Sequence, residues 1–142
     1  MNPPLRTARD RDALLEGLLD GTIDMIATDH APHSAKEKAG GLWDSRMGVV
    51  GLETAFPMLY TRLVRTGKLP LDRLLYAMSE APRRRFGIPQ GEDFSIWELD
   101  TPYTIDPQAF LSKGKSTPFA GQQVYGRCLA TIRGGKFVWL HK

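Results

Sequence analysis

Three side chains that could bind a metal ion or move a proton lie within five positions of one another: Asp29, His30 and His33. A carboxylate and two imidazoles can ligate zinc or transfer protons near neutral pH. A catalytic zinc site needs at least three protein ligands, and the third histidine, His141, lies beside the C-terminus. The residues alone therefore leave two interpretations open: a polar turn, or part of a site whose other ligands lie outside this chain.

A helix and a short apolar segment precede this cluster and must position it. Thr7 predicts an N-cap for a helix over residues 8–20, with Asp10 completing an acidic capping box and Gly21 ending the helix. Leucines at helical spacing give this helix one apolar face.

Residues 23–28 form a short, nearly continuous apolar run, which favours a buried parallel strand. We therefore expect Asp29 to follow the C-terminal end of that strand, the edge where parallel α/β proteins carry out chemistry. Residues 30–50 show no period and contain three glycines, so we expect a long functional loop.

The remaining chain predicts two helices and then several strands. The helices are expected over residues 52–66, where Pro57 predicts a kink or a later start, and over residues 71–86. The strands are expected at residues 94–99, 103–105, 128–133 and 136–140, the last two forming a hairpin around Gly134-Gly135. One parallel strand cannot form a sheet by itself, so the α/β portion is incomplete.

Composition excludes several classes of protein. The 142 residues are 42% hydrophobic and 25% charged with a net charge of +3, which is typical of a globular protein rather than a nucleic-acid-binding one. Arg83-Arg84-Arg85 is the basic run, which we interpret as charge at a helix C-terminus, with a phosphate site as the alternative. Cys128 is the single cysteine, so no internal disulfide can form. Without a long apolar segment or a signal peptide, we expect a soluble cytoplasmic protein with no membrane contact.

Several motifs occur in the order found in class I dihydroorotases, and the chain resembles the C-terminal part of that family. They are Asn2-Pro3-Pro4-Leu5-Arg6, the run from Asp20 to His33 that ends in Asp-His-Ala-Pro-His, Gly51-Leu52-Glu53-Thr54-Ala55-Phe56-Pro57, Ser112-Lys113, Thr117-Pro118-Phe119 and Gly121. The resemblance covers the whole chain, and the Asp-His-Ala-Pro-His string is its most specific part.

The resemblance implies a fold. The family has an α/β fold, an amidohydrolase (β/α)8 barrel, with a small β-sandwich built from both ends of the chain. Residues 1–90 would form the C-terminal part of the barrel, with its last strand and flanking helices. Residues 91–142 would form strands of the β-sandwich.

The resemblance also implies roles for five residues. Asp29 matches the aspartate that binds the metal and acts as the catalytic acid and base. His33 matches the histidine that binds the substrate carboxylate, and Asn2 matches the asparagine that contacts the pyrimidine ring. Met47 and Gly48 match the loop pair whose backbone closes on the substrate. By contrast, we expect His30 to support the structure, and Glu53 to cap the helix that follows it or orient the loop of residues 30–50.

The implied activity is the reversible cyclisation of N-carbamoyl-L-aspartate to L-dihydroorotate in pyrimidine biosynthesis, with one or two Zn²⁺ ions. This chain carries at most one metal ligand, so we expect it to be inactive alone. Without the other barrel strands it would expose the apolar faces of residues 23–27 and of its helices, so we also expect it to self-associate or form homo-oligomers. The alternatives are a related hydantoinase or allantoinase, or a non-catalytic scaffold that binds aspartate transcarbamoylase. Asn2 and His33 favour dihydroorotase, because a histidine suits an anionic substrate group.

Overall fold

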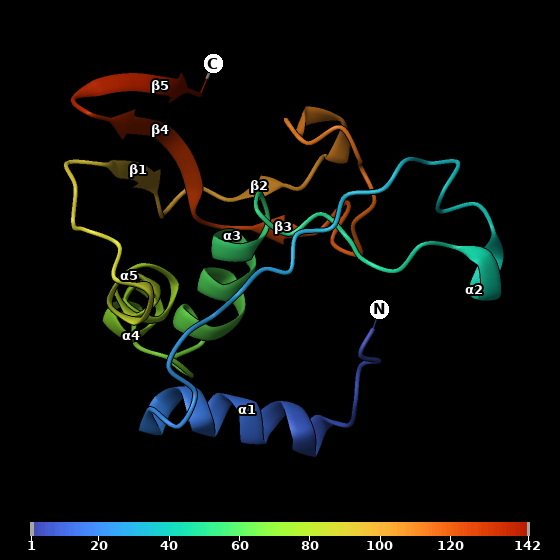
Figure 1. Cartoon of the computed structure of the whole chain (residues 1–142), viewed down its shortest axis with the longest axis horizontal. Helices are drawn as coiled ribbons and strands as arrows, with labels where there is room; N and C mark the ends of the chain where they lie inside the picture. The colour runs from blue at the N-terminus through green and yellow to red at the C-terminus, as the bar shows by residue number, and fades with distance from the viewer. Residues whose placement is uncertain (1, 142) are drawn as a thin grey trace.

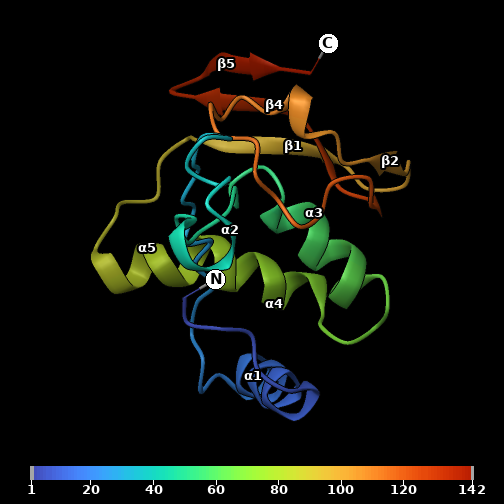
Figure 2. The same cartoon turned by 90° about the vertical axis from the view of Figure 1, so that its right-hand side faces the viewer.

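The computed structural model describes residues 2–141, and their elements stack in three layers (Figures 1 and 2). Helix α1 (Ala8–Asp20) forms one outer layer, and an antiparallel sheet forms the other. The helices of residues 55–86 lie between them. A long loop that carries the short helix α2 (Gly41–Asp44) extends away from these layers on one side (Figure 1).

Helix α1 has the ends that the sequence predicts. The Thr7 hydroxyl accepts a hydrogen bond from the Asp10 amide, and the Asp10 carboxylate accepts one from the Thr7 amide at 2.9 Å, which completes the capping box. Gly21 ends the helix in the left-handed conformation, with φ of 89°. Hydrogen bonds from Thr7 lower the pKa of the Asp10 carboxyl below its ordinary value.

Residues 23–28 do not form the predicted strand. A strand needs a neighbouring ladder, and within residues 2–141 no parallel strand lies beside this segment. Other elements satisfy its backbone instead. The Arg73 guanidinium donates to the Ile23 carbonyl at 2.9 Å and also to the carbonyl of Leu18 in the last turn of α1. Arg73 therefore joins α1 and this segment to the middle layer.

The two predicted middle helices are confirmed, and each contains one π-helical turn. The first begins later than residue 52, as Pro57 allowed, because its regular part starts at Ala55. Its two parts are α3 (Ala55–Leu59) and η1 (Tyr60–Val64). The second runs without a break through α4 (Leu71–Leu75), η2 (Tyr76–Glu80) and α5 (Ala81–Phe86).

The π-helical turn η2 leaves one carbonyl for the segment before Asp29. The Ala81 amide bonds to the Tyr76 carbonyl, five residues back, and Pro82 has no amide hydrogen to continue the pattern. The carbonyl of Ala77 therefore lacks a helical donor, and the Ile26 amide donates to it at 3.0 Å. This bond fixes the middle of the predicted strand segment against the helix.

Aromatic and aliphatic side chains of the middle layer form the core. Phe56, Tyr60, Leu69 and Leu74 are buried together. The Phe56 ring lies 4.4 Å from that of Trp97 in the sheet, measured between centroids, so this pair joins the helical layer to the C-terminal strands.

The C-terminal strands form an antiparallel sheet in the order β1-β4-β5. These strands are β1 (Phe94–Glu98), β4 (Arg127–Arg133) and β5 (Lys136–Leu140). The predicted hairpin between β4 and β5 is confirmed, and Gly134 and Gly135 have φ of 53° and 73°, which the tight turn requires. The predicted strand at 103–105 is present as β2 (Tyr103–Thr104), which pairs with β3 (Gln123–Val124). The strand β3 and the short helix η3 (Pro107–Ala109) were not predicted.

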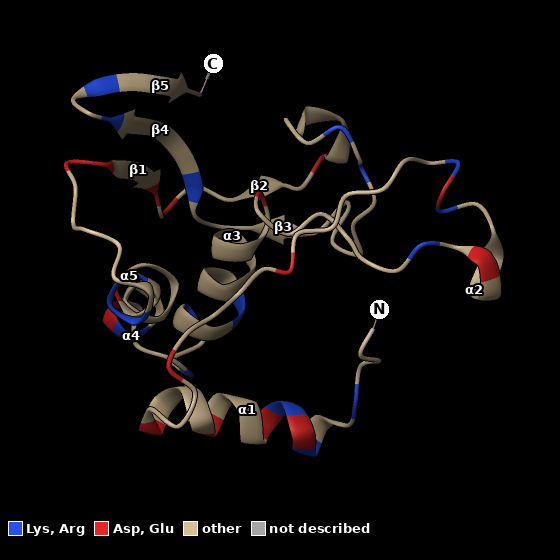
Figure 3. Cartoon of the chain, viewed as in Figure 1, with Lys and Arg blue, Asp and Glu red and all other residues tan. Residues whose placement is uncertain are grey.

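The surface carries exposed apolar side chains on the sheet and charged side chains of both signs on several elements (Figure 3). Phe94, Phe137, Val138 and Leu140 leave more than half of their surface exposed on the sheet. Basic and acidic residues occur on the same elements, for example along α1 and the loop around α2 (Figure 3).

No helix in the described part of the chain is long and apolar enough to cross a membrane. Residues 2–141 form helices and small sheets but no closed barrel.

Candidate functional site

Asp29 occupies an unusual backbone conformation. Its φ is 46°, and among the described residues it is the one non-glycine residue with a positive φ. Aspartate tolerates this left-handed region better than most residues, but the conformation still costs energy. Such an outlier motivates a functional hypothesis for the residue that carries it. Asp29 is also exposed, so its carboxylate is accessible.

Three glycines allow other segments to lie directly against the turn of residues 28–33. A Cβ atom at any of them would meet this turn at less than 3.0 Å, which is closer than atoms normally approach. The glycines are Gly51, against the Thr28 carbonyl at 2.9 Å, Gly48, against the Ala31 Cβ at 2.5 Å, and Gly114, against the His33 backbone at 2.7 Å. The turn is therefore packed between backbone segments far from it in the sequence.

His30 holds this turn to the segment before α3. Its Nδ1 accepts hydrogen bonds from the amides of Gly51 at 3.0 Å and Leu52 at 3.2 Å. The proton of a neutral ring must then sit on Nε2, which lies 3.4 Å from the Ser112 hydroxyl. This placement agrees with the expected structural role of His30.

Glu53 holds a second loop beside the turn. Its carboxylate accepts hydrogen bonds from the amides of Leu111 at 2.7 Å and Ser112 at 3.0 Å. Glu53 therefore orients residues 110–113, and it neither caps α3 nor bonds to the loop of residues 30–50 as the sequence led us to expect. Nothing in the sequence around Glu53 indicated this partner, which lies 58 positions away.

His33 and the loop pair Met47 and Gly48 are brought together. His33 Nε2 lies 2.9 Å from the Met47 carbonyl, and since a carbonyl only accepts, Nε2 donates. His33 Nδ1 lies 3.8 Å from the Glu37 carboxylate. Gly48 packs on Ala31 in the same turn. Hydrogen bonds from Ser34 lower the pKa of the Glu37 carboxyl, so this group stays ionised beside His33.

Asn2 is not joined to this group. It is exposed, and its peptide bond to Pro3 is cis. Within the described residues, Asn2 makes no hydrogen bond to Asp29 or His33. Its expected contact with a substrate ring stays a prediction.

The described residues do not assemble a metal site by themselves. Within residues 2–141 no three His, Cys, Asp or Glu side chains come close enough to share an ion. A zinc ion at a catalytic site needs at least three such ligands, so the donors in this part of the chain do not suffice. Asp29 can supply one carboxylate at most.

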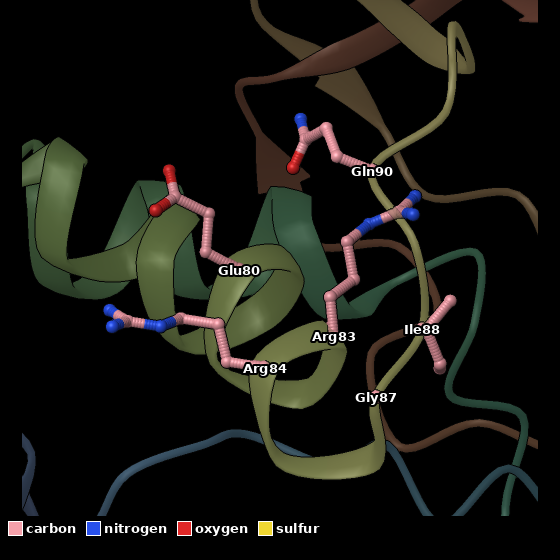
Figure 4. A pocket seen from close by; sticks show the side chains of 6 residues that line it. All are labelled: Glu80, Arg83, Arg84, Gly87, Ile88 and Gln90. Carbon is pink, nitrogen blue, oxygen red and sulfur yellow. The ribbon is translucent and has the colours of Figure 1, made fainter.

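Asp29 lines neither of two hollows in the described chain. One of about 310 Å³ lies at the end of α5 and is lined by Glu80, Arg83, Arg84, Gly87, Ile88 and Gln90 (Figure 4). The guanidinium groups of Arg83 and Arg84 point in different directions there, and Arg83 donates to the Pro89 carbonyl at 3.0 Å. This geometry favours the interpretation of helix-end charge over a phosphate site. A second, open hollow of about 1150 Å³ lies beside β1 and β4.

Comparison with known proteins relates the chain to dihydroorotases. A dihydroorotase of Geobacillus sp. is 53% identical over 146 residues, which include 98% of this chain and 34% of that enzyme. The chain matches the C-terminal part of a dihydroorotase. A dihydroorotase of Bacillus anthracis is 52% identical over the same length. The chain thus spans about a third of the dihydroorotases that it matches. No protein-family model matches it.

Solved structures agree with this assignment at the level of the fold. The L-hydantoinase (dihydropyrimidinase) of Arthrobacter aurescens superposes with a TM-score of 0.88 at 36% identity, over 96% of this chain and 33% of that one. The inactive dihydroorotase-like domain of a Chaetomium thermophilum CAD-like multifunctional protein superposes with a TM-score of 0.72 at 23% identity, over 96% and 37%. Dihydroorotases and hydantoinases are cyclic amidohydrolases, and the chain has the mixed α/β fold of the matching part of these proteins.

Proposed function

We propose that this chain supplies the catalytic turn of a dihydroorotase, which interconverts N-carbamoyl-L-aspartate and L-dihydroorotate. The observation that carries the proposal is the position of Asp29. It lies at a positive φ on a turn that also contains His33, and the Met47–Gly48 segment packs against the same turn. The chain is 53% identical to the dihydroorotase of Geobacillus sp., and this identity supports the same activity.

Asp29 is the proton-transfer group in this proposal. A carboxylate within hydrogen-bond reach of the reacting atoms can accept a proton from the attacking water during hydrolysis. It can return that proton to the ring nitrogen as the amide bond breaks, and the reverse sequence forms the ring. The exposure of Asp29 leaves it open to a substrate.

The loop residues would hold the substrate. His33, Met47 and Gly48 would contact its carboxylate and carbonyl groups, and Asn2 would contact the ring. In the present structure His33 Nε2 donates to Met47, so binding a carboxylate would use Nδ1 or require this bond to exchange. A ring that keeps the Nε2 bond can also donate from Nδ1 only when it carries both protons, and the Glu37 carboxylate lies 3.8 Å from Nδ1.

Zinc enters this proposal through residues outside the chain. Asp29 would contribute one ligand to a site of one or two Zn²⁺ ions in the longer enzyme, where zinc would act as a Lewis acid. The donors of residues 2–141 do not complete such a site, so no catalytic step is assigned to zinc here.

In the longer enzyme, residues 1–90 would complete a (β/α)8 barrel, and residues 23–28 would become its eighth strand. Residues 91–142 would join a β-sandwich, which would cover the exposed apolar side chains of β1 and β5. The chain alone should therefore be inactive and should self-associate. A monodisperse, catalytically active monomer in sedimentation and turnover assays would contradict this part of the proposal.

Complementation tests the proposed activity. The chain would be mixed with the remaining two thirds of the Geobacillus dihydroorotase, and turnover of dihydroorotate would be measured. We expect activity from the mixture, absence of activity from each part, and a loss of at least about 100-fold with Asp29→Asn. Activity that survives Asp29→Asn would refute the assigned role.

A hydantoinase is the second candidate, because the L-hydantoinase structure covers nearly all of this chain at 36% identity. The same mixture would be assayed with hydantoin. We expect dihydroorotate to be preferred, since His33 suits an anionic group. A strong preference for hydantoin would replace dihydroorotase with this alternative.

A non-catalytic scaffold for aspartate transcarbamoylase is the third candidate. We consider it because the chain resembles an inactive dihydroorotase-like domain in structure. That likeness is at 23% identity and concerns the fold alone. Co-sedimentation of the chain with aspartate transcarbamoylase, together with an inactive complemented mixture, would favour the scaffold.

A further inference from the structure

Three successive carbonyl groups beside the candidate site are held by two side chains. Lys38 Nζ donates to the carbonyl of Arg46 at 2.7 Å and to that of Gly48 at 2.9 Å. His33 Nε2 donates to the intervening carbonyl of Met47 at 2.9 Å. The carbonyl groups of residues 46–48 are therefore all held by these two side chains.

Fixing a carbonyl also fixes the next amide. In a trans peptide the carbonyl of one residue and the N–H of the next lie in one plane and point in opposite directions. The bonds to Arg46 and Met47 therefore orient the N–H groups of Met47 and Gly48 away from Lys38 and His33. Inside residues 2–141 these two N–H groups donate to no other group, so both are available to a ligand.

Lys38 is itself held in place. It follows a turn in which the Ser34 amide and hydroxyl donate to the Glu37 carboxylate at 2.8 and 2.7 Å. The Lys38 carbonyl accepts a bond from the Ser45 hydroxyl at 2.9 Å, and the Arg46 amide donates to the Glu37 carbonyl at 3.0 Å. These two bonds join residues 37–38 to residues 45–46, the two ends of the loop that carries α2. The Lys38 side chain is half-buried there.

The charge of Lys38 is not neutralised by its partners. Both hydrogen-bond acceptors are carbonyls, and within the described part of the chain no carboxylate forms an ion pair with Lys38. A positive charge held beside two free amide donors attracts an anionic group more strongly than a neutral one.

We propose that Lys38 is a positioning residue, which holds residues 46–48 so that the amides of Met47 and Gly48 bind a carboxylate-bearing ligand in preference to a neutral ring. The hold on the loop stands on the contacts above, and the effect on the ligand rests on the proposed function. Lys36 is the matched control, because it is exposed in the same loop and its side chain makes no hydrogen bond within residues 2–141.

Hydrogen exchange on the whole chain tests the hold on the loop without requiring activity. The Arg46 amide bonds to Glu37 and the Ala31 amide bonds to Val49, so both report on residues 46–49. Lys38→Met should speed exchange at Arg46 and Ala31 by about tenfold, since one charge-assisted contact to each of two carbonyls is lost. Lys36→Met should leave both unchanged. Equal exchange at Arg46 in the two variants would overturn the proposal.

The Ile105 amide, which bonds to Gln122, reports whether the variant still folds. If its protection is lost in Lys38→Met, acetylation of the unmodified chain replaces the comparison. Mass spectrometry would follow acetic anhydride labelling, and Lys38 should react about tenfold more slowly than Lys36 because its ammonium group is engaged. Equal labelling rates of the two lysines would overturn the proposal.

Kinetics of the complemented enzyme test the effect on the ligand. Lys38→Met should raise KM for dihydroorotate about tenfold with kcat changed less than about twofold, and should leave KM for hydantoin unchanged. Lys38→Arg should have a KM for dihydroorotate close to that of the wild type. Equal KM changes for both substrates would overturn the preference for anions. An inactive wild-type mixture would count against the proposed function, while exchange and labelling would still decide whether Lys38 holds the loop.

Discussion

Two regions of the chain, the C-terminal sheet and residues 23–33, are stabilised in different ways. Strands β1, β4 and β5 form ladders with one another, so the C-terminal region satisfies most of its own backbone. Residues 23–33 have no ladder and are held by groups from several other segments, among them Arg73, Ala77 and Gly51. The candidate site thus lies in the region that depends most on its neighbours, whereas the regular sheet exposes apolar side chains.

This difference matches what each region would gain from a longer chain. The turn around Asp29 would gain ligands and a strand ladder, and the sheet would gain a cover for its apolar surface. In this chain the turn and the segment before it are positioned instead by hydrogen bonds to Arg73, Ala77 and Gly51. Under the proposed function, Asp29 would be the one metal-binding group that this chain contributes.

The largest effect is expected where the two regions meet. Phe56→Ala removes a buried ring that packs between Tyr60 and Trp97, and should lower the free energy of unfolding by about 3–5 kcal/mol. Urea unfolding followed by tryptophan fluorescence, to which Trp97 contributes as one of three tryptophans, would measure this loss. Phe86→Ala, at a ring that is 67% exposed, is the control and should cost less than about 1 kcal/mol. Similar losses in both variants would contradict the packing described between the regions.

A smaller loss is expected at the turn. Gly48→Ala places a Cβ 2.5 Å from that of Ala31 at a φ of 114°, and should lower the free energy of unfolding by about 2–4 kcal/mol. Gly67→Ala also has a positive φ, but its value of 71° lies close to the left-handed region that other residues can adopt, and its Cβ meets no atom within 4 Å. It should cost only about 1–2 kcal/mol. Thermal unfolding of both variants would measure the two losses, and equal losses would contradict the close packing of Gly48 on the turn.

The smallest effect is expected at the N-cap of α1, which the sequence alone predicted. Thr7→Ala should cost about 1 kcal/mol at neutral pH, measured by urea unfolding. Hydrogen bonds from Thr7 depress the pKa of Asp10, so the stability that they contribute is present above the ordinary pKa of 3.8. It is lost as the pH falls through the lower folded pKa. The difference between wild type and variant should therefore shrink in acid, and a constant difference would contradict the role of Asp10.

Local patterns in the sequence predicted the elements that depend on local contacts. Thr7, Asp10 and Gly21 specify a helix through neighbours a few positions away, and Gly134-Gly135 specifies a hairpin turn in the same way. The strand at residues 23–28 could not be confirmed in this chain, because a parallel strand depends on partners elsewhere.

The candidate site was predictable in part. The motif located Asp29 and His33, and the structure brings His33, Met47 and Gly48 together. The contacts of Lys38 and Glu53 could not be predicted, since each reaches backbone groups whose approach depends on the folded loop rather than on a residue pattern.

A zinc titration of the chain tests most directly whether Asp29 is one ligand of a site completed elsewhere. Calorimetry of residues 1–142 with Zn²⁺ at neutral pH should show no tight stoichiometric binding, since the described residues bring no three ligands together. Asp29→Asn should leave the titration unchanged. One equivalent of zinc bound tightly by the wild-type chain and lost in Asp29→Asn would contradict the account, because the chain would then hold a complete site.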